Sequence, residues 1–245
     1  MRILFCGQVP KDPNYPEATE DAAGVATDAV RIAISDGASE SFDSKSWAQL
    51  LVDTYIISPE LKPDWLEEVI KQYNAKFDVS SLSWSKQAAF ERGSFATLLG
   101  VEECPAHSSV DILSIGDSLA VLLSGTDMID SFPYHNPKQF QQHPELFCTT
   151  LSLNSFFGNS NFFSQHHKTW DLKQLSNPTL LCMTDALGEW ALRMAMENTP
   201  RWEHLLSIKD TTQLEALVLS EREKKCMRVD DVTLISVALG LDCAP

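Results

Sequence analysis

Apolar residues recur along this chain in two different periods, which predicts strands and helices in separate blocks. The run Val30–Ser35 is short, apolar and rich in β-branched residues, and it stops at Asp36-Gly37. These features are typical of a buried strand that enters a tight turn. Apolar residues then follow at helical spacing, which predicts a group of amphipathic helices. The predicted helices cover 47–55, 65–77 and 84–91.

The period changes again after Gly93, where three short apolar runs follow one another. Turn residues separate them, and Gly116-Asp117-Ser118 lies between the last two. Short runs with turn signals between them indicate a meander of antiparallel strands. The predicted strands are 94–101, 110–115 and 119–123.

The segment 131–177 is rich in Asn, Gln, His, Phe, Ser and Pro and has no steady period. We expect an irregular flap here, and long irregular segments in compact domains are often lids or binding loops. Its phenylalanines could form a rim that recognises a partner, but we expect them to anchor the flap to the core. The pair His166-His167 could supply a general acid, but we expect solvent-facing loop histidines.

The last third of the chain returns to regular structure. A strand over 178–184 stops at Asp185, helices follow over 187–196 and from Asp210, and 232–239 is the last strand. Because strands and helices do not alternate strictly, the fold class is α+β, with antiparallel sheets and helices on their outer faces. The sequence shows no strong internal boundary, so we expect a single domain over 1–245.

Acidic residues outnumber basic ones, 34 against 19, which gives a net charge of −15. Such a surface repels phosphate backbones and anionic headgroups, so nucleic acid and membranes are disfavoured as partners. No stretch has the roughly 20 apolar residues needed to span a bilayer. The apolar run at the start is too short for a signal-peptide core, and the cysteines are scattered without a CxxC pair. We therefore expect a protein of the reducing cytoplasm.

Aspartates stand where four of the predicted strands begin or end. Any one of them is explained by a turn, because Asp favours turns. Together they are costly, since two carboxylates about 4 Å apart repel by roughly 4 kcal/mol at an effective dielectric near 20. Hard divalent cations such as Mg²⁺ or Mn²⁺ prefer oxygen ligands and would offset that repulsion. The aspartates are Asp36, Asp117, Asp185 and the pair Asp230-Asp231.

Six short motifs follow one another along the chain. They are Glu20-Asp21-Ala22, Ser35-Asp36-Gly37, Gly93-Ser94-Phe95-Ala96-Thr97, Gly116-Asp117-Ser118, Thr184-Asp185-Ala186 and Asp230-Asp231-Val232-Thr233. In this order they resemble the motifs of the metal-dependent serine/threonine protein phosphatases of type 2C. The resemblance implies an α-β-β-α sandwich with two Mg²⁺ or Mn²⁺ ions at one end. It also implies hydrolysis of phosphoserine and phosphothreonine by direct attack of a metal-bridging water, in signalling that opposes a partner serine/threonine kinase.

The resemblance also implies roles for individual residues. Asp36 would bridge the two metals, and the carbonyl of Gly37 would bind the first. Asp185 and Asp230 would hold the second, so that Asp36, Asp185 and Asp230 are the catalytic set. Glu20 would contribute directly or through water. Two further positions are Asp117, for a third and weaker metal site, and Asp231, close to the substrate phosphate.

The sequence departs from the family pattern where many members carry a phosphate-gripping arginine before the Glu-Asp pair. Here that stretch is 14–19 and contains no basic residue. Lys11 or Arg2 could take that role. The missing arginine leaves a second hypothesis, a weakly active or inactive phosphatase-fold module that binds a kinase or another signalling partner. The aspartates favour the active enzyme, because a binding module has no physical need for converging carboxylates.

Overall fold

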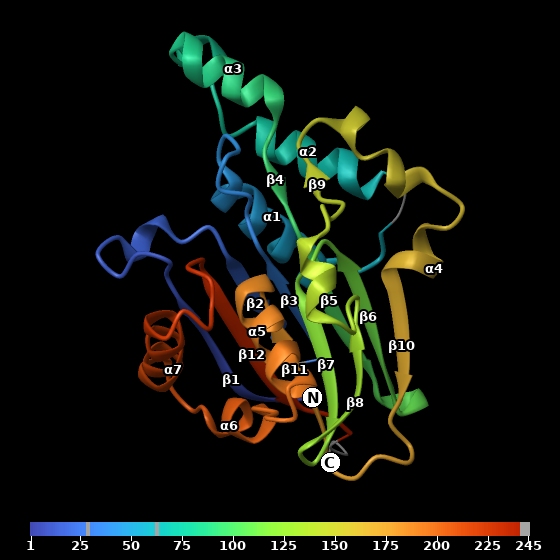
Figure 1. Ribbon diagram of the computed structural model, residues 1–245. Helices are drawn as coiled ribbons and strands as arrows, with labels where there is room; N and C mark the ends of the chain where they lie inside the picture. The colour runs from blue at the N-terminus through green and yellow to red at the C-terminus, as the bar shows by residue number, and fades with distance from the viewer. Residues whose placement is uncertain (28–29, 62–63, 241–245) are drawn as a thin grey trace.

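The computed structural model describes residues 1–27, 30–61 and 64–240. Two five-stranded antiparallel sheets pack face to face, with helices on both outer faces (Figure 1). The first sheet has the order β1 (Arg2–Val9), β12 (Val232–Ala238), β11 (Pro178–Met183), β7 (Leu119–Ser124) and β8 (Asp127–Phe132). The second has the order β10 (His167–Asp171), β6 (Ser109–Ile115), β5 (Leu98–Cys104), β3 (Arg31–Ser35) and β2 (Ala22–Val25).

The core between the sheets is built from alternating residues of the central strands. Ile34 and Leu99 from the second sheet and Leu180 and Ile235 from the first are fully buried in one cluster. In each strand the next residue points to the opposite face, because side chains alternate along a strand. Each sheet therefore has a second apolar face, which a layer of helices covers.

Two layers of helices cover these outer faces. Trp47 and Leu51 of α1 and Leu66 of α2 pack on the second sheet, and Trp190 of α5 packs on the first. Helix α3 has no buried residue and projects from the body of the molecule (Figure 1). The predicted α+β sandwich is confirmed. The helices are α1 (Ser44–Ile57), α2 (Trp65–Asn74), α3 (Trp84–Arg92), α4 (Phe162–His166), α5 (Asp185–Met196), α6 (Trp202–Ser207) and α7 (Thr211–Glu223).

The prediction of a three-stranded meander is wrong at its last step. Strands β5 and β6 pair within the second sheet, but β7 belongs to the first sheet, where it lies between β11 and β8. The turn between β6 and β7 therefore crosses from one sheet to the other. Gly116 enters this turn with a φ of 105°, a conformation that side chains with a Cβ rarely adopt.

The segment 131–177 is more ordered than the sequence indicated. It contains β9 (Phe147–Cys148), which pairs with β4 (Phe95–Ala96), and it supplies α4 and the edge strand β10. Phe156 and Phe162 are buried, so these phenylalanines do anchor the segment to the core. The prediction of a solvent-facing His166 is wrong, since its Nδ1 lies 2.9 Å from the carbonyl oxygen of Ser114 in a buried position.

No helix in the described ranges combines the length and apolar character that a membrane crossing requires.

Candidate functional site

Four of the acidic side chains converge at one end of the sandwich. Asp36 follows β3, Asp117 lies in the turn that crosses between the sheets, and Asp230 precedes β12. The pKa of Asp36 is raised well above its ordinary range, first by burial and then by the charges of Asp21, Asp117 and Asp230. Carboxylates that raise one another's pKa lie close together without enough positive charge between them.

A hydrogen-bonded bridge fixes the two turns that carry Asp36 and Asp117. The N–H of Asp36 donates to Thr97 Oγ1 at 2.8 Å, and the N–H of Thr97 donates to the Asp36 carbonyl at 2.9 Å. The Thr97 hydroxyl also lies 3.0 Å from the hydroxyl of Ser118. Gly37 forms a bridge with Ala96 and so fixes the next residue of the turn.

Asp21 belongs to this cluster, although the sequence argument assigned it no role. Its carboxylate is buried and accepts hydrogen bonds from Thr184 Oγ1 at 3.0 Å and Thr233 Oγ1 at 2.6 Å. Burial, with the charges of Asp231 and Asp230, raises its pKa to about 7 against the opposing effect of the two hydroxyls. The available signal was that two of the motifs contain a threonine, Thr184 next to Asp185 and Thr233 two residues after Asp231.

Glu20 is engaged in a separate network with a basic residue. Its carboxylate accepts from Lys11 Nζ at 2.8 Å and from the hydroxyls of Ser39 and Ser44. Burial acts to raise the pKa of Glu20, but these three donors outweigh it and lower the pKa. Its role as a metal ligand stays a prediction.

Asp231 anchors the loop that precedes β2. Its Oδ1 accepts the N–H of Lys11 at 2.7 Å, and its Oδ2 accepts the N–H of Glu20 at 2.8 Å. Both oxygens of this buried carboxylate are therefore used to close the loop 12–19. A contact between Asp231 and a substrate phosphate stays a prediction.

Two arginines that sequence reasoning did not assign to the site also reach into it. Arg228 Nη2 forms an ion pair with Asp185 Oδ2. Burial raises the pKa of Asp117 as it does that of Asp36, and the charge of Arg228 opposes both rises. Arg222 leaves the end of α7 and donates to the carbonyls of Pro10, at 3.0 Å, and of Asp230. Arg222 therefore joins the end of α7 to the chain on both sides of the site.

Lys11 and Arg2 are the two basic residues that the sequence offered for binding the substrate phosphate. Of these two, only Lys11 lies at the acidic end of the sandwich. Lys11 follows β1, whose last residue Val9 pairs with Val232, next to Asp231. Arg2 pairs with Ala238 at the other end of the same strands. The hydrogen bond to Glu20, with its charge and those of Asp231 and Asp230, raises the pKa of Lys11 against the effect of burial, so its ammonium stays charged.

The fit of these residues to a divalent cation is tested by their unsatisfied oxygens. Asp185 Oδ1 and Asp21 Oδ1 are buried and accept no hydrogen bond from the described residues. Such oxygens are the ligands that Mg²⁺ and Mn²⁺ prefer. Across the described residues, no three His, Cys, Asp or Glu side chains close around one point, and Arg228 holds Asp185. The donor set fits the chemistry of these ions. Arg228 holds Asp185 Oδ2 and has to release it before a metal can bind that oxygen.

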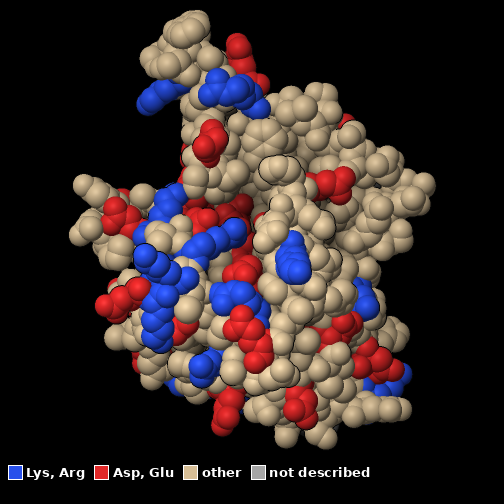
Figure 2. Space-filling model, viewed as in Figure 1, with Lys and Arg blue, Asp and Glu red and all other residues tan. Residues whose placement is uncertain are grey.

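Acidic groups gather in a recess of the face shown in Figure 2, with basic groups around it. The recess lies above α5 and beside the loop before β2. An anion that approaches this face meets lysines and arginines at the edge and carboxylates inside.

Protein phosphatases are among the solved structures that share this arrangement of sheets and helices. A bacterial serine phosphatase matches with a TM-score of 0.56 and 16% identity, over 96% of this chain and 98% of that chain. This chain has the type 2C phosphatase fold. The serine/threonine phosphatase Stp1 from Staphylococcus aureus matches with a TM-score of 0.54 and 17% identity, over 96% of this chain and 94% of that chain.

The fold is shared over nearly the whole length of a third structure. The Mycobacterium tuberculosis serine/threonine phosphatase PstP/Ppp matches with a TM-score of 0.55 and 15% identity, over 97% of this chain and 99% of that chain. No family model and no curated protein matches the sequence. The likeness to type 2C phosphatases is therefore a likeness of fold, and the activity has to be argued from the site.

Proposed function

We propose that this protein is a metal-dependent phosphatase that hydrolyses phosphoserine and phosphothreonine monoesters on proteins. The observation that carries the proposal is the convergence of Asp21, Asp117 and Asp230 on the buried Asp36. Burial and then these three charges raise the pKa of Asp36 well above its ordinary range. A fold gains no stability from buried carboxylates that repel one another. Their retention at the end of a phosphatase fold is explained by cations bound during function.

Asp36, the Gly37 carbonyl, Asp185 and Asp230 are the residues that would hold the two ions, with Glu20 beside them. Asp117 would serve the third, weaker site. Mg²⁺ or Mn²⁺ at this position supplies Lewis-acid activation of water and neutralises the charge of the phosphoryl group. Thr97 and Ser118 keep the Asp36 and Asp117 turns in register, and Asp21 orients Thr184 and Thr233 beside them.

The reaction needs no protein nucleophile. Water adds to phosphorus, the ester P–O bond breaks, and the serine or threonine hydroxyl leaves with a proton. Lys11 is the basic side chain we propose for binding the phosphate, because it lies at this end and its ammonium stays charged. We place the reaction in cytoplasmic signalling opposite a serine/threonine kinase.

Hydrolysis of p-nitrophenyl phosphate and of a phosphothreonine peptide tests the proposal. We expect turnover with Mn²⁺ or Mg²⁺, none with EDTA, and a loss of about 100-fold or more in Asp36→Asn, because removing transition-state charge stabilisation has costs of this order. Asp127→Asn, which changes an exposed aspartate on β8, is the matched control and should keep full activity. Turnover that resists EDTA, or full activity of Asp36→Asn, would refute the mechanism.

The second candidate function is a non-catalytic module that binds a kinase or another signalling partner. The ion pairs of Arg228 with Asp185 and of Lys11 with Glu20 favour it, because they neutralise part of the acidic end without a metal. Calorimetric titration with Mn²⁺ separates the two candidates. Two sites together with turnover support the enzyme, and absence of Mn²⁺ binding together with absence of turnover supports the module.

A further inference from the structure

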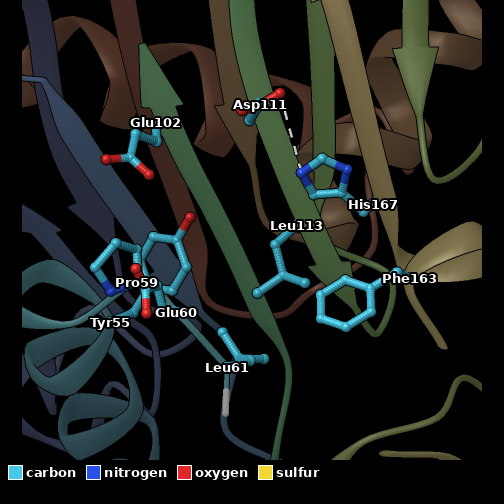
Figure 3. Close-up of a pocket in the computed structure, with 9 residues that line it drawn as sticks. All are labelled: Tyr55, Pro59, Glu60, Leu61, Glu102, Asp111, Leu113, Phe163 and His167. Atoms are coloured by element: carbon cyan, nitrogen blue, oxygen red, sulfur yellow. Dashed lines mark ion pairs between the residues drawn. The ribbon is translucent and has the colours of Figure 1, made fainter. Parts of the chain in front are cut away.

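A surface pocket of about 320 Å³ lies on the outer face of the second sheet, away from the carboxylate cluster. Its walls come from α1, from the chain that follows α1, from β5 and β6, and from α4 and β10 (Figure 3). One half of the wall is polar and acidic, and the other is apolar. The lining residues are Tyr55, Pro59, Glu60, Leu61, Glu102, Asp111, Leu113, Phe163 and His167.

The hydroxyl of Tyr55 points into this pocket and has no partner in the described structure. Tyr55 is only 4% exposed, and its hydroxyl forms no hydrogen bond with any of the described residues. Figure 3 shows this oxygen directed toward the space between Glu102 and Asp111. A tyrosine hydroxyl in such a position usually finds a hydrogen-bond partner. A ligand in the pocket can therefore pair with it.

A glycine in the second sheet makes room for the Tyr55 ring. Gly100 lies under it on β5, and a Cβ added there would stand 2.2 Å from Cζ of Tyr55. Only glycine leaves room for the ring against this strand. The glycine therefore lets α1 present the hydroxyl at the acidic half of the pocket.

Two carboxylates flank the hydroxyl, and both act on it. After burial, the charges of Glu102 and Asp111 are the next causes that raise the pKa of Tyr55, and Arg31 opposes them. Among the described residues Glu102 forms no ion pair, whereas Asp111 accepts from Thr169 and lies 4.0 Å from His167. Negative charge therefore dominates this half of the pocket.

The other half is apolar and reaches the surface. Leu113 forms part of the wall and is buried, Leu61 is partly exposed, and Phe163 is 60% exposed at the rim. A ligand that fills both halves has a cationic head with several N–H donors and an apolar stem. Lysine and arginine side chains have this form, because each carries its charge on a flexible chain of methylene groups.

We propose that this pocket binds a basic side chain, lysine or arginine, of a partner protein. The charged head would donate to Glu102, Asp111 and the Tyr55 hydroxyl, and the stem would lie against Leu113 and Phe163. A protein partner is favoured over a free amine because Phe163 offers exposed apolar area beyond the pocket, which the backbone beside a basic residue can cover.

The pocket is separate from the carboxylate cluster and does not depend on the proposed activity. Glu102 pairs with Arg31 at the start of β3, whereas Asp36 follows the end of that strand. The two positions are about 17 Å apart at the usual rise of a strand. A bound basic residue would therefore leave the acidic end of the sandwich free.

Binding of short peptides to the full-length protein tests the proposal. The probe is a fluorescent glycine-serine peptide with one central arginine, and the reference is the same peptide with citrulline, which keeps the shape and removes the charge. Anisotropy is measured at about 0.15 M salt, where exposed charges are largely screened. We expect at least tenfold tighter binding of the arginine peptide, since hydrogen bonds to charged groups have this effect.

Variants locate the binding and separate it from general attraction to an acidic protein. Glu102→Gln should weaken the arginine peptide about tenfold, and Tyr55→Phe, which keeps the ring, about threefold. Glu197→Gln removes an exposed charge at the end of α5 and should change nothing. Circular dichroism of each variant confirms that it is folded.

Three results would overturn the proposal. Equal binding of the citrulline peptide would show that charge is not recognised. Equal weakening by Glu197→Gln and Glu102→Gln would show long-range attraction without a site. Tighter binding of free 1,5-diaminopentane than of the peptide, lost in Glu102→Gln, would assign the pocket to a small amine and not to a protein.

Discussion

Arg228 and Asp185 form an ion pair at the acidic end of the sandwich. Arg228 comes from the loop before Asp230, and Asp185 begins α5 directly after β11. The guanidinium also opposes the rise of the pKa of Asp36 and Asp117, so it is a positive charge within the carboxylate cluster. A divalent cation bound here would therefore compete with Arg228 for the same carboxylates.

This competition predicts that Arg228→Gln binds Mn²⁺ more tightly. Removal of the guanidinium frees Asp185 and takes away a repulsive charge, and an effect of about 1.4 kcal/mol corresponds to tenfold. We expect roughly three- to tenfold tighter binding by isothermal titration calorimetry. Arg92→Gln removes an exposed arginine at the end of α3 and should leave the affinity unchanged. Weaker binding in Arg228→Gln would show that Arg228 supports the metal site.

Asp231→Asn should loosen the loop 12–19. An asparagine keeps one acceptor and turns its NH₂ group toward the second backbone N–H, which leaves that donor unsatisfied at a cost of about 1–3 kcal/mol. We expect a loss of this size in the free energy of unfolding by urea, with faster tryptic cleavage after Lys11.

The matched control for this prediction is Asp12→Asn. Asp12 lies in the same loop, but among the described residues its carboxylate accepts only from Asn14, so its change removes the same charge without releasing the anchor. Unchanged cleavage in Asp231→Asn would contradict the anchoring role.

The raised pKa of Asp21 predicts how the free energy of unfolding depends on pH in the absence of metal. Its pKa is about 7 in the folded protein and 3.8 ordinarily, so the folded state binds more protons between these values. Stability should therefore fall as pH rises from about 4 to about 7, by as much as about 4 kcal/mol from this group. Urea unfolding in EDTA at pH 5 and pH 8 should show a smaller fall in Asp21→Asn than in the native chain or Asp127→Asn. An equal fall in all three would contradict the raised pKa.

Gly100→Ala should destabilise the protein and disturb the pocket. The new Cβ would overlap the Tyr55 ring, and overpacking of this kind costs about 1–3 kcal/mol. In the double variant with Tyr55→Leu the cost should be smaller than the sum of the two single changes, because residues in contact are coupled. Thermal and urea unfolding measure this coupling, and strict additivity would show that the ring does not rest on Gly100.

Local patterns predicted much of the fold. The strand before Asp36 and the helices around Trp47 and Trp190 follow from apolar periodicity and turn residues, which act over a few neighbouring positions. The same signals placed Asp36 and Asp117 in turns. The fold brings these two turns together. The local patterns did not predict that fold in full, and the resemblance to type 2C phosphatases supplied the expectation.

The remaining features depend on distant contacts that no local pattern encodes. The sheet that β7 joins is decided by its pairing with β11, and the edge strand β10 is short, polar and recognisable only beside β6. Arg222 lies at the end of α7, and its long side chain reaches the carbonyl of Pro10, which is far away in sequence. Asp231 was assigned to substrate by resemblance, and its two backbone donors come from a loop more than two hundred residues earlier.

The acidic end joins the two sheets, whose facing sides are held together largely by apolar contact. Asp36 follows a strand of the second sheet, whereas Asp185 and Asp230 flank strands of the first. Apolar contact has no direction, so it resists sliding of one sheet over the other less than a directed bond does. A cation held between these carboxylates is therefore also a cross-link between the two halves of the sandwich. Loading with metal would then slow the opening of this end, so that chemistry and rigidity would be gained together.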